Sequence, residues 1–239
     1  MALDDSEGGE TSRQNFNLIF LKNLDGKTFL KNQVFLTRYD FELYSNFTFF
    51  LNDPVNGDQI RQRENRNILG YNGSWNRETN LGGKRLQSEI GLQLRYDEVD
   101  DIELSRTKNR RETILPLALG NVQEVNAAIY AVETLDFSHH WQLVAGLRYD
   151  RFYFAYDNVL DSLYDHRDQM KGAVSPKFNL IFAPSKALRF FFSAALGFHS
   201  NDSRVVISQA GRQILPAAFG IESGAIFKPF PRLLLNFSL

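Results

Sequence analysis

Apolar and polar residues alternate along several stretches of the chain. A period of two is typical of β-strands, because successive side chains of a strand point to opposite faces. The clearest stretch is residues 39–51, YDFELYSNFTFFL. Residues 28–38 run on into this strand, and the other stretches that read as strands are 14–23, 66–78, 86–97, 121–135, 141–150, 175–183, 188–199, 217–228 and 232–239. Together they predict an all-β fold of about ten strands without an amphipathic helix.

The connections between these stretches are alternately short and long. The short ones suit tight hairpins, and they lie at Asp25–Gly26, 80–83, 137–140, Pro184–Ser185 and 229–231. The long ones lie at 52–65, 98–120, 157–172 and 200–216. Because every second connection is long, an antiparallel up-and-down sheet places all long loops at one end. In transmembrane barrels that end is extracellular, and the short turns are periplasmic.

A soluble β-sandwich also alternates, so the pattern alone does not separate it from a barrel in lipid. Two features favour the barrel. Stretches such as 39–51 and 188–198 are long for a sandwich, whose strands usually have about five to six residues. Aromatic residues also gather near the expected strand ends, where interfacial girdles form in membrane barrels. They are Tyr39, Trp75, Tyr96, Trp141, Tyr149 and Tyr153.

The alternation assigns side chains to two faces of the expected barrel. If the apolar positions face lipid, the polar positions between them face the lumen, which suits a hydrated solute or a plug domain. The expected lumen-facing residues are Asp40, Glu42, Glu89, Gln93, Arg95, Arg148, Lys177 and Asn179. The expected lipid-facing residues are Phe41, Leu43, Leu92, Leu94, Leu147, Phe178, Leu180, Phe190 and Phe192.

Composition removes several other classes of function. A net charge of -1 gives no global field for nucleic acid, and the absence of cysteine removes thiol catalysis, disulfides and thiolate metal sites. No stretch approaches the roughly 18 uncharged apolar residues of a transmembrane helix. The histidines are scattered, so we expect no catalytic constellation, metal site or cofactor. They are His139, His140, His166 and His199.

Two charge clusters lie in the expected loop at 98–120. The acidic one could hold calcium or be a solvated loop, and it lacks the glycine-bearing spacing of an EF-hand. It consists of Asp97, Glu98, Asp100, Asp101 and Glu103. The basic one could contact lipopolysaccharide phosphates or an anionic ligand, or could balance its acidic neighbour. It consists of Arg106, Lys108, Arg110 and Arg111.

Residues 174–204, VSPKFNLIFAPSKALRFFFSAALGFHSNDSR, resemble a late-barrel stretch of TonB-dependent receptors. In that family a Ser-Pro-Lys strand, a short turn and an aromatic strand ending in Gly-Phe-His-Ser-Asn-Asp occur together. Residues 45–66 resemble an extracellular strand and loop of the same family, and the strand at 146–150 fits it too. The resemblance implies a barrel of about 22 strands, an N-terminal plug domain and a TonB-contacting segment.

About ten strands cannot close such a barrel, so we expect residues 1–239 to form part of a transmembrane β-barrel. Residues 1–12 are expected to be the tail of an extracellular loop, and 13–239 to be strands, turns and loops. The start MALDDSEGGETS lacks the basic and apolar regions of a signal peptide. A longer outer-membrane protein, cut at both ends, is therefore expected.

The resemblance implies the function as well. The parent protein is expected to import a scarce, bulky nutrient such as a ferric siderophore, with energy coupling by TonB, in the bacterial outer membrane. Its expected partners are outer-membrane lipid, the plug domain, the TonB complex and a small-molecule ligand at the extracellular loops, with no enzymatic activity and no nucleic acid. A passive porin or structural barrel is one alternative, and a soluble β-sheet binding protein is another.

Overall fold

The computed structural model describes residues 4–160, 165–199 and 215–239. In this part of the chain ten antiparallel strands form one sheet, ordered as in the sequence. They are β1 (Gly8–Asp25), β2 (Thr28–Ser45), β3 (Ile60–Leu81), β4 (Lys84–Lys108), β5 (Glu112–Asp136), β6 (Trp141–Asn158), β7 (Asp165–Phe182), β8 (Leu188–Phe198), β9 (Ala217–Phe230) and β10 (Leu233–Ser238). The prediction of an antiparallel up-and-down fold is confirmed.

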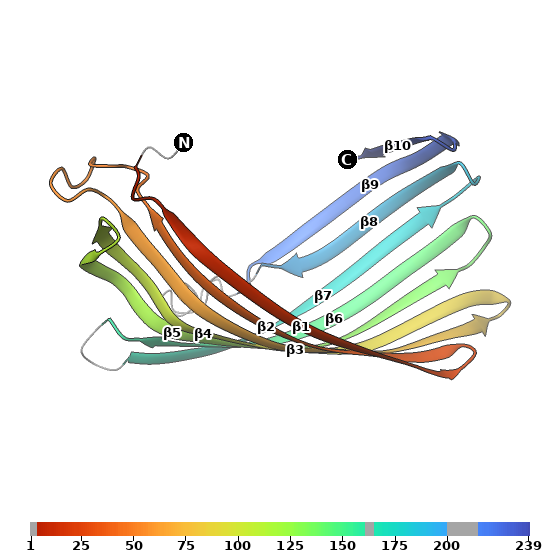
Figure 1. The fold of residues 1–239 in the computed structure, drawn as a ribbon. Coiled ribbons are helices and arrows are strands. Elements are labelled where there is room, and N and C mark those ends of the chain that lie inside the picture. The colour runs from red at the N-terminus through yellow and green to blue at the C-terminus, as the bar shows by residue number, and fades with distance from the viewer. Residues whose placement is uncertain (1–3, 161–164, 200–214) are drawn as a thin grey trace.

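The sheet has no second layer. Figure 1 shows that it is strongly curved, with β1 at one edge and β10 at the other. No helix or second sheet covers either face in the described residues. Few apolar side chains are therefore buried, and many large ones are more than a third exposed, such as Leu147 at 56% and Ile129 at 56%. Within the same residues, no helix is long and apolar enough to cross a membrane.

The connections alternate between the two ends of the sheet in the expected order, although the one at 109–111 is short. At one end of the sheet the strands are joined by the short turns 26–27, 82–83, 137–140, 183–187 and 231–232. Gly82 and Gly83 have φ of 58° and 83°, a left-handed conformation that other residues rarely adopt. The opposite end carries the connections 46–59, 109–111, 159–164 and 199–216. Most of the expected loop at 200–216 falls outside the described residues.

Several expected boundaries are wrong at this second end. β2 ends at Ser45, so the strand expected over 39–51 stops early, and Phe49 has a φ of 54° that breaks the extended chain. The loop expected over 98–120 is a tight hairpin at 109–111, where Asn109 and Arg110 have φ of 52° and 58°. β1 begins at Gly8 and not at residue 13. Likewise, the loop expected over 157–172 reduces to 159–164 between β6 and β7.

Charged composition explains why the end of β4 was expected to be a loop. In β4 the last residues are rich in Asp, Glu and Arg, which favours a loop when sequence is read alone. Here they continue the ladder, with Ile102 paired to Gly120 and Arg106 to Leu115, interrupted by register shifts. Both faces of a strand that projects beyond hydrocarbon meet water, so its side chains need no apolar alternation.

Glycines allow large side chains to lie flat on the sheet. The ring of Tyr130 on β5 covers Gly91, its paired residue on β4, in the space that a Cβ of residue 91 would take. In the same position the Tyr130 hydroxyl donates to Glu89 Oε1 at 2.7 Å. Glycine at 91 is therefore required by a close approach and not by backbone dihedral angles.

We expect Gly91→Ala to lower the free energy of unfolding by about 1–3 kcal/mol, because the added methyl displaces the Tyr130 ring. The control is Gly220→Ala on β9, where a Cβ meets no atom within 4 Å. This change should leave stability unaltered or raise it by up to about 1 kcal/mol. Urea unfolding in detergent micelles measures both, and equal effects of the two substitutions would contradict the close approach.

Candidate functional site

The strand register assigns each side chain to one of two faces, since residues paired across antiparallel strands point the same way. One continuous row of pairs is Gln33, Asn72, Gln93, Ala128 and Asp150, and we name its side of the sheet the polar face. The next row is Val34, Tyr71, Leu94, Ala127 and Arg151, and its side is the apolar face. The two faces differ chemically along most of the sheet.

The polar face is the concave one. A hollow of about 630 Å³ lies over β1 to β5 near the short turns. Its lining includes the polar-face residues Phe29, Asn76, Gln87, Glu89, Val132 and Thr134. A hollow that is lined by several neighbouring strands lies on the face toward which the sheet curves. Across the same surface, Arg148 Nη1 on β6 donates to Gln93 Oε1 on β4, passing over Ala128 on β5.

Two arginine–aspartate pairs lie in the middle of the polar face. Arg148 donates to both oxygens of Asp150, at 2.7 Å from Nε to Oδ2 and 2.8 Å from Nη2 to Oδ1. The Asp150 side chain is only 1% exposed, and it also accepts from Asn126 Nδ2 at 3.1 Å. Arg95 holds Asp97 in the same two-bond arrangement, at 2.8 and 2.7 Å. Two charge-assisted hydrogen bonds of this kind offset part of the cost of burying a carboxylate.

The register brings most of the expected site residues together. Six polar candidates share the polar face: Glu89, Gln93, Arg95, Arg148, Lys177 and Asn179. Seven apolar candidates share the apolar face: Leu92, Leu94, Leu147, Phe178, Leu180, Phe190 and Phe192. The alternation therefore gave a consistent division for β4, β6, β7 and β8.

For β2 the division is reversed. Asp40 and Glu42 lie on the apolar face in phase with Leu36, and Phe41 and Leu43 lie on the polar face. The expected grouping of these four residues with the others is therefore wrong. On β1 and β3 the partners of Asp40 and Glu42 are also polar, namely Ser12, Glu10, Asn65 and Arg63. This end of β2 lies beyond the apolar rows, so its alternation does not follow the division into a polar and an apolar face.

Aromatic side chains line the apolar face near the short turns. Trp141 stacks on Phe182 with ring centroids 4.4 Å apart, and Phe182 stacks on Phe190 at 6.3 Å. Phe137, in the adjoining turn, lies 6.1 Å from Trp141. Stacked rings at strand ends are the arrangement of an interfacial girdle, in which amphipathic and aromatic groups meet the headgroup level.

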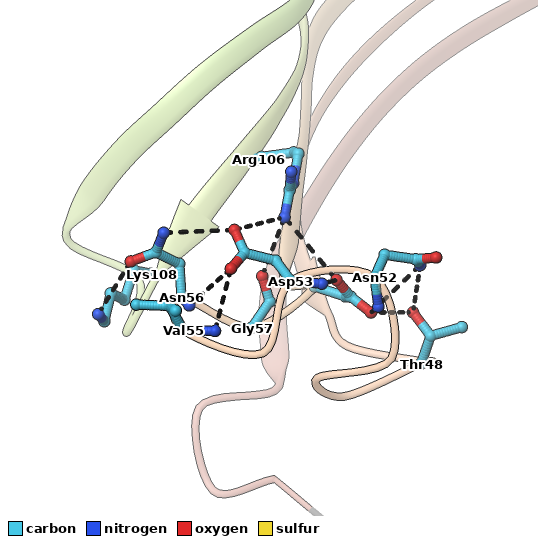
Figure 2. A network of polar contacts seen from close by, with 9 residues as sticks. Thr48, Asn52, Asp53, Val55, Asn56, Gly57, Arg106 and Lys108 are labelled. Carbon is cyan, nitrogen blue, oxygen red and sulfur yellow. Dashed lines mark hydrogen bonds and ion pairs between the residues drawn. The ribbon is translucent and has the colours of Figure 1, made fainter.

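At the other end of the sheet, residues 46–59 form a folded loop (Figure 2). The Asp53 carboxylate accepts the backbone N–H groups of Val55 at 3.1 Å and Asn56 at 3.0 Å. Arg106 on β4 donates through Nη2 to Asp53 Oδ2 at 3.1 Å and to the Gly57 carbonyl at 3.2 Å. The loop is thus tied to a strand that lies far from it in sequence.

A second carboxylate organises the same loop. Asp58 accepts from the backbone N–H of Asn52 at 2.9 Å, from that of Asp53 at 2.9 Å and from the Thr48 hydroxyl at 2.8 Å. The Asn52 N–H donor lowers the pKa of Asp58, and the Asn56 and Val55 N–H donors lower the pKa of Asp53. Hydrogen bonds to the ionised form stabilise it, so both carboxylates hold the loop as anions.

The charge clusters noted in the sequence do not form one binding site. Glu103 accepts from Arg61 Nε at 3.0 Å, and Asp101 accepts from Asn65 Nδ2 at 3.0 Å, while Asp97 pairs with Arg95. Of the basic residues, Arg106 is engaged with the loop. Among the described residues no group of three or more His, Asp or Glu is placed to hold a metal ion.

A single curved antiparallel sheet with one polar and one apolar face is the architecture expected of the wall of a membrane barrel. The family model "TonB dependent receptor-like, beta-barrel" matches residues 2–228. The chain belongs to this family. TonB-dependent receptors are outer-membrane proteins of Gram-negative bacteria, and the family consists of transporters and not of enzymes.

Solved TonB-dependent receptors share the fold. The unliganded ferric citrate transporter FecA aligns with a TM-score of 0.75 at 14% identity, over 91% of this chain and 32% of that one. The siderophore receptor PiuA from Acinetobacter baumannii aligns at 0.80 and 11% identity, over 98% and 40%. The ferric-catecholate import receptor Fiu from K12 E. coli, in its closed form, aligns at 0.72 and 15%, over 98% and 41%.

This chain of a TonB-dependent receptor therefore spans less than half the length of those structures. At such identities the likeness shows the fold alone. No protein with curated function gives a significant sequence match.

We expect the folded loop at 46–59 to persist at neutral and mildly acidic pH and to open below about pH 3.8, the ordinary carboxyl value. A carboxylate whose pKa is lowered by folding stabilises the structure above its ordinary value and loses this effect as the pH falls through the lowered one. Amide hydrogen exchange of the loop as a function of pH measures the transition.

The substitution Arg106→Gln should raise exchange in the same loop at pH 7, because it removes the ties to Asp53 and Gly57. The matched control is Arg111→Gln, since no ion pair among the described residues involves Arg111. Protection that is unchanged in Arg106→Gln, or reduced equally in both variants, would show that the tie does not hold the loop.

Proposed function

We propose that this chain is part of the wall of an outer-membrane channel through which its parent protein imports a scarce, bulky nutrient of the ferric siderophore type, with energy coupling by TonB. The observation that carries the proposal is the division of one curved sheet into a polar concave face and an apolar convex face. Such a wall separates hydrated solute from hydrocarbon. Its aligned neighbours are described as a ferric citrate transporter, a siderophore receptor and a ferric-catecholate import receptor.

The apolar face is proposed to contact lipid. On the central strands its side chains include Leu94, Leu147, Tyr149 and Val174, which are 43–56% exposed. Burying such side chains in hydrocarbon is favourable by roughly 25 cal/mol per Å² of apolar surface. The polar face is proposed to line the lumen, opposite a plug domain, with Glu89, Gln93, Arg95, Arg148, Lys177 and Asn179 among its residues.

The long-loop end is proposed to bind the ligand. The folded loop at 46–59 presents apolar side chains at its surface, with Phe47 84%, Leu51 76% and Val55 76% exposed. Exposed apolar groups gathered on a hydrogen-bonded loop are a common feature of binding surfaces. The polar network beneath them keeps the loop in one shape, which lowers the entropic cost of binding.

The natural tryptophans test the lipid contact without any substitution. The chain has two, Trp75 and Trp141, and both lie on the apolar face, paired with Ile90 and Phe182. In bilayers whose acyl chains carry bromine, we expect their fluorescence to be strongly quenched, while iodide in the water phase quenches weakly. Weak quenching by brominated lipid together with strong quenching by iodide would place both rings in water and reject the lipid face.

Uptake by cells tests the import function. We expect the full-length parent protein to support accumulation of a radiolabelled ferric siderophore in cells with functional TonB and not in cells lacking it. Uptake that is equal in both strains would instead indicate a passive porin. Within this chain, the triple substitution Phe47→Ser, Phe50→Ser and Leu51→Ser should weaken ligand binding about tenfold or more.

The matched control for the loop is Leu81→Ser. Leu81 is 59% exposed, but it lies at the end of β3 beside a short turn, away from the proposed ligand. It should leave binding unchanged. If the triple variant also binds normally, the loop at 46–59 is not a ligand contact, whatever the outcome of the TonB comparison.

A further inference from the structure

Three neighbouring connections at the short-turn end enclose two adjoining hollows. The larger, of about 500 Å³, lies between the turn at 137–140, the turn at 183–187 and the end of β9. The smaller, of about 350 Å³, shares His139, His140 and Arg189 with it. Arg189 pairs with Ile226, and both lie on the polar face. The larger hollow therefore opens toward the concave side of the sheet.

The larger hollow is lined by basic side chains without an acidic one. They are His139, His140, Lys186, Arg189 and Lys228. No ion pair within the described ranges involves Lys186, Arg189 or Lys228. In the smaller hollow Asp136 is engaged elsewhere, since it accepts from Gln142 at 2.7 Å and pairs with Arg85 at 3.9 Å.

The lining differs from the surroundings of Arg95 and Arg148 on the same face. There, Arg95 and Arg148 each donate two hydrogen bonds to a carboxylate on their own strand. Positive charge around a hollow without such a partner creates a local field that attracts anions. A guanidinium and two ammonium groups are also the donors that proteins use for carboxylate and phosphate oxygens.

Backbone hydrogen bonds hold the three connections in place. The Ala183 N–H donates to the His140 carbonyl at 2.7 Å, joining the first two turns. The Lys228 N–H donates to the Ala187 carbonyl at 2.7 Å, joining the second turn to β9. The basic groups therefore start from a fixed backbone, so less conformational entropy is lost when an anion binds.

We propose that the larger hollow is a binding site for a small solute bearing carboxylate or phosphate groups. Its volume is within the range of small-molecule sites, about 300–1,000 Å³. Leu188, Ile226 and Leu234 add apolar surface for the carbon skeleton of such a solute. Its position at the periplasmic mouth of a lumen rests on the proposed function. The polar-face position of Arg189 disfavours a membrane lipid, because hydrocarbon is assigned to the opposite face.

Calorimetric titration with inorganic pyrophosphate tests the site, using the full chain folded in zwitterionic detergent at low ionic strength. We expect saturable binding that weakens about tenfold or more in the double variant Arg189→Gln and Lys228→Gln. The matched control is Lys22→Gln with Lys84→Gln, which removes the same charge near the same end of the sheet outside the hollow. It should weaken binding less than threefold. Circular dichroism establishes that each variant keeps its β-sheet.

Three results would overturn the proposal. They are no binding by the folded chain, an equal loss in both double variants, and displacement of pyrophosphate by phosphatidylglycerol but not by phosphatidylcholine. The third would assign the hollow to a lipid headgroup. The two proposals fail separately: pyrophosphate binding with uptake independent of TonB rejects only the import function, and TonB-dependent uptake without pyrophosphate binding rejects only the anion site.

Discussion

The backbone hydrogen-bond ladder is the interaction on which the structure depends. In hydrocarbon each unpaired N–H or C=O costs several kcal/mol, so a chain without a protein core is stable there only if every strand is paired. From β2 to β9 each strand has two neighbours, whereas β1 and β10 each have one. Those two edges therefore need further partners in hydrocarbon, and in the proposed barrel lipid takes the place of a second layer on the apolar face.

Pairing through the backbone places few limits on which residue types the polar face carries. The ladder between strands is formed by the backbone, so side chains on this face can be charged as long as each buried charge has a partner. Asp150 illustrates the condition, since it is almost inaccessible yet carries hydrogen bonds from both Arg148 and Asn126. Tyr130 and Gly91 show a second way in which this face is built: the tyrosine ring lies over the backbone of the neighbouring strand, in the space left by the missing side chain of the glycine.

The sequence could predict the strands and the two faces of most of the sheet, but little of the structure at the loop end. Alternation located the strands and placed residues such as Leu92 and Gln93 on opposite faces of the sheet. It failed at the loop end: the phase of Asp40 and Glu42 is reversed, and β4 continues through charged residues. The hydrogen bonds that fold the loop at 46–59 could not be predicted either, because Arg106 and Asp53 are brought together only by the register of β3 and β4.

The distribution of charge along the polar face links the wall to the proposed transport. Paired charges such as those of Arg95 and Asp97 present dipoles and little net field, so a solute passing them is not held strongly. At the short-turn end, the described lining of the basic hollow includes no carboxylate, which is why we propose that it favours anions. If both proposals hold, a weakly binding wall that ends in an anion-binding mouth gives an anionic solute a lower free energy at the mouth than along the wall. On that view, the energy supplied through TonB would serve to open the path and would not be needed to draw the solute along the wall.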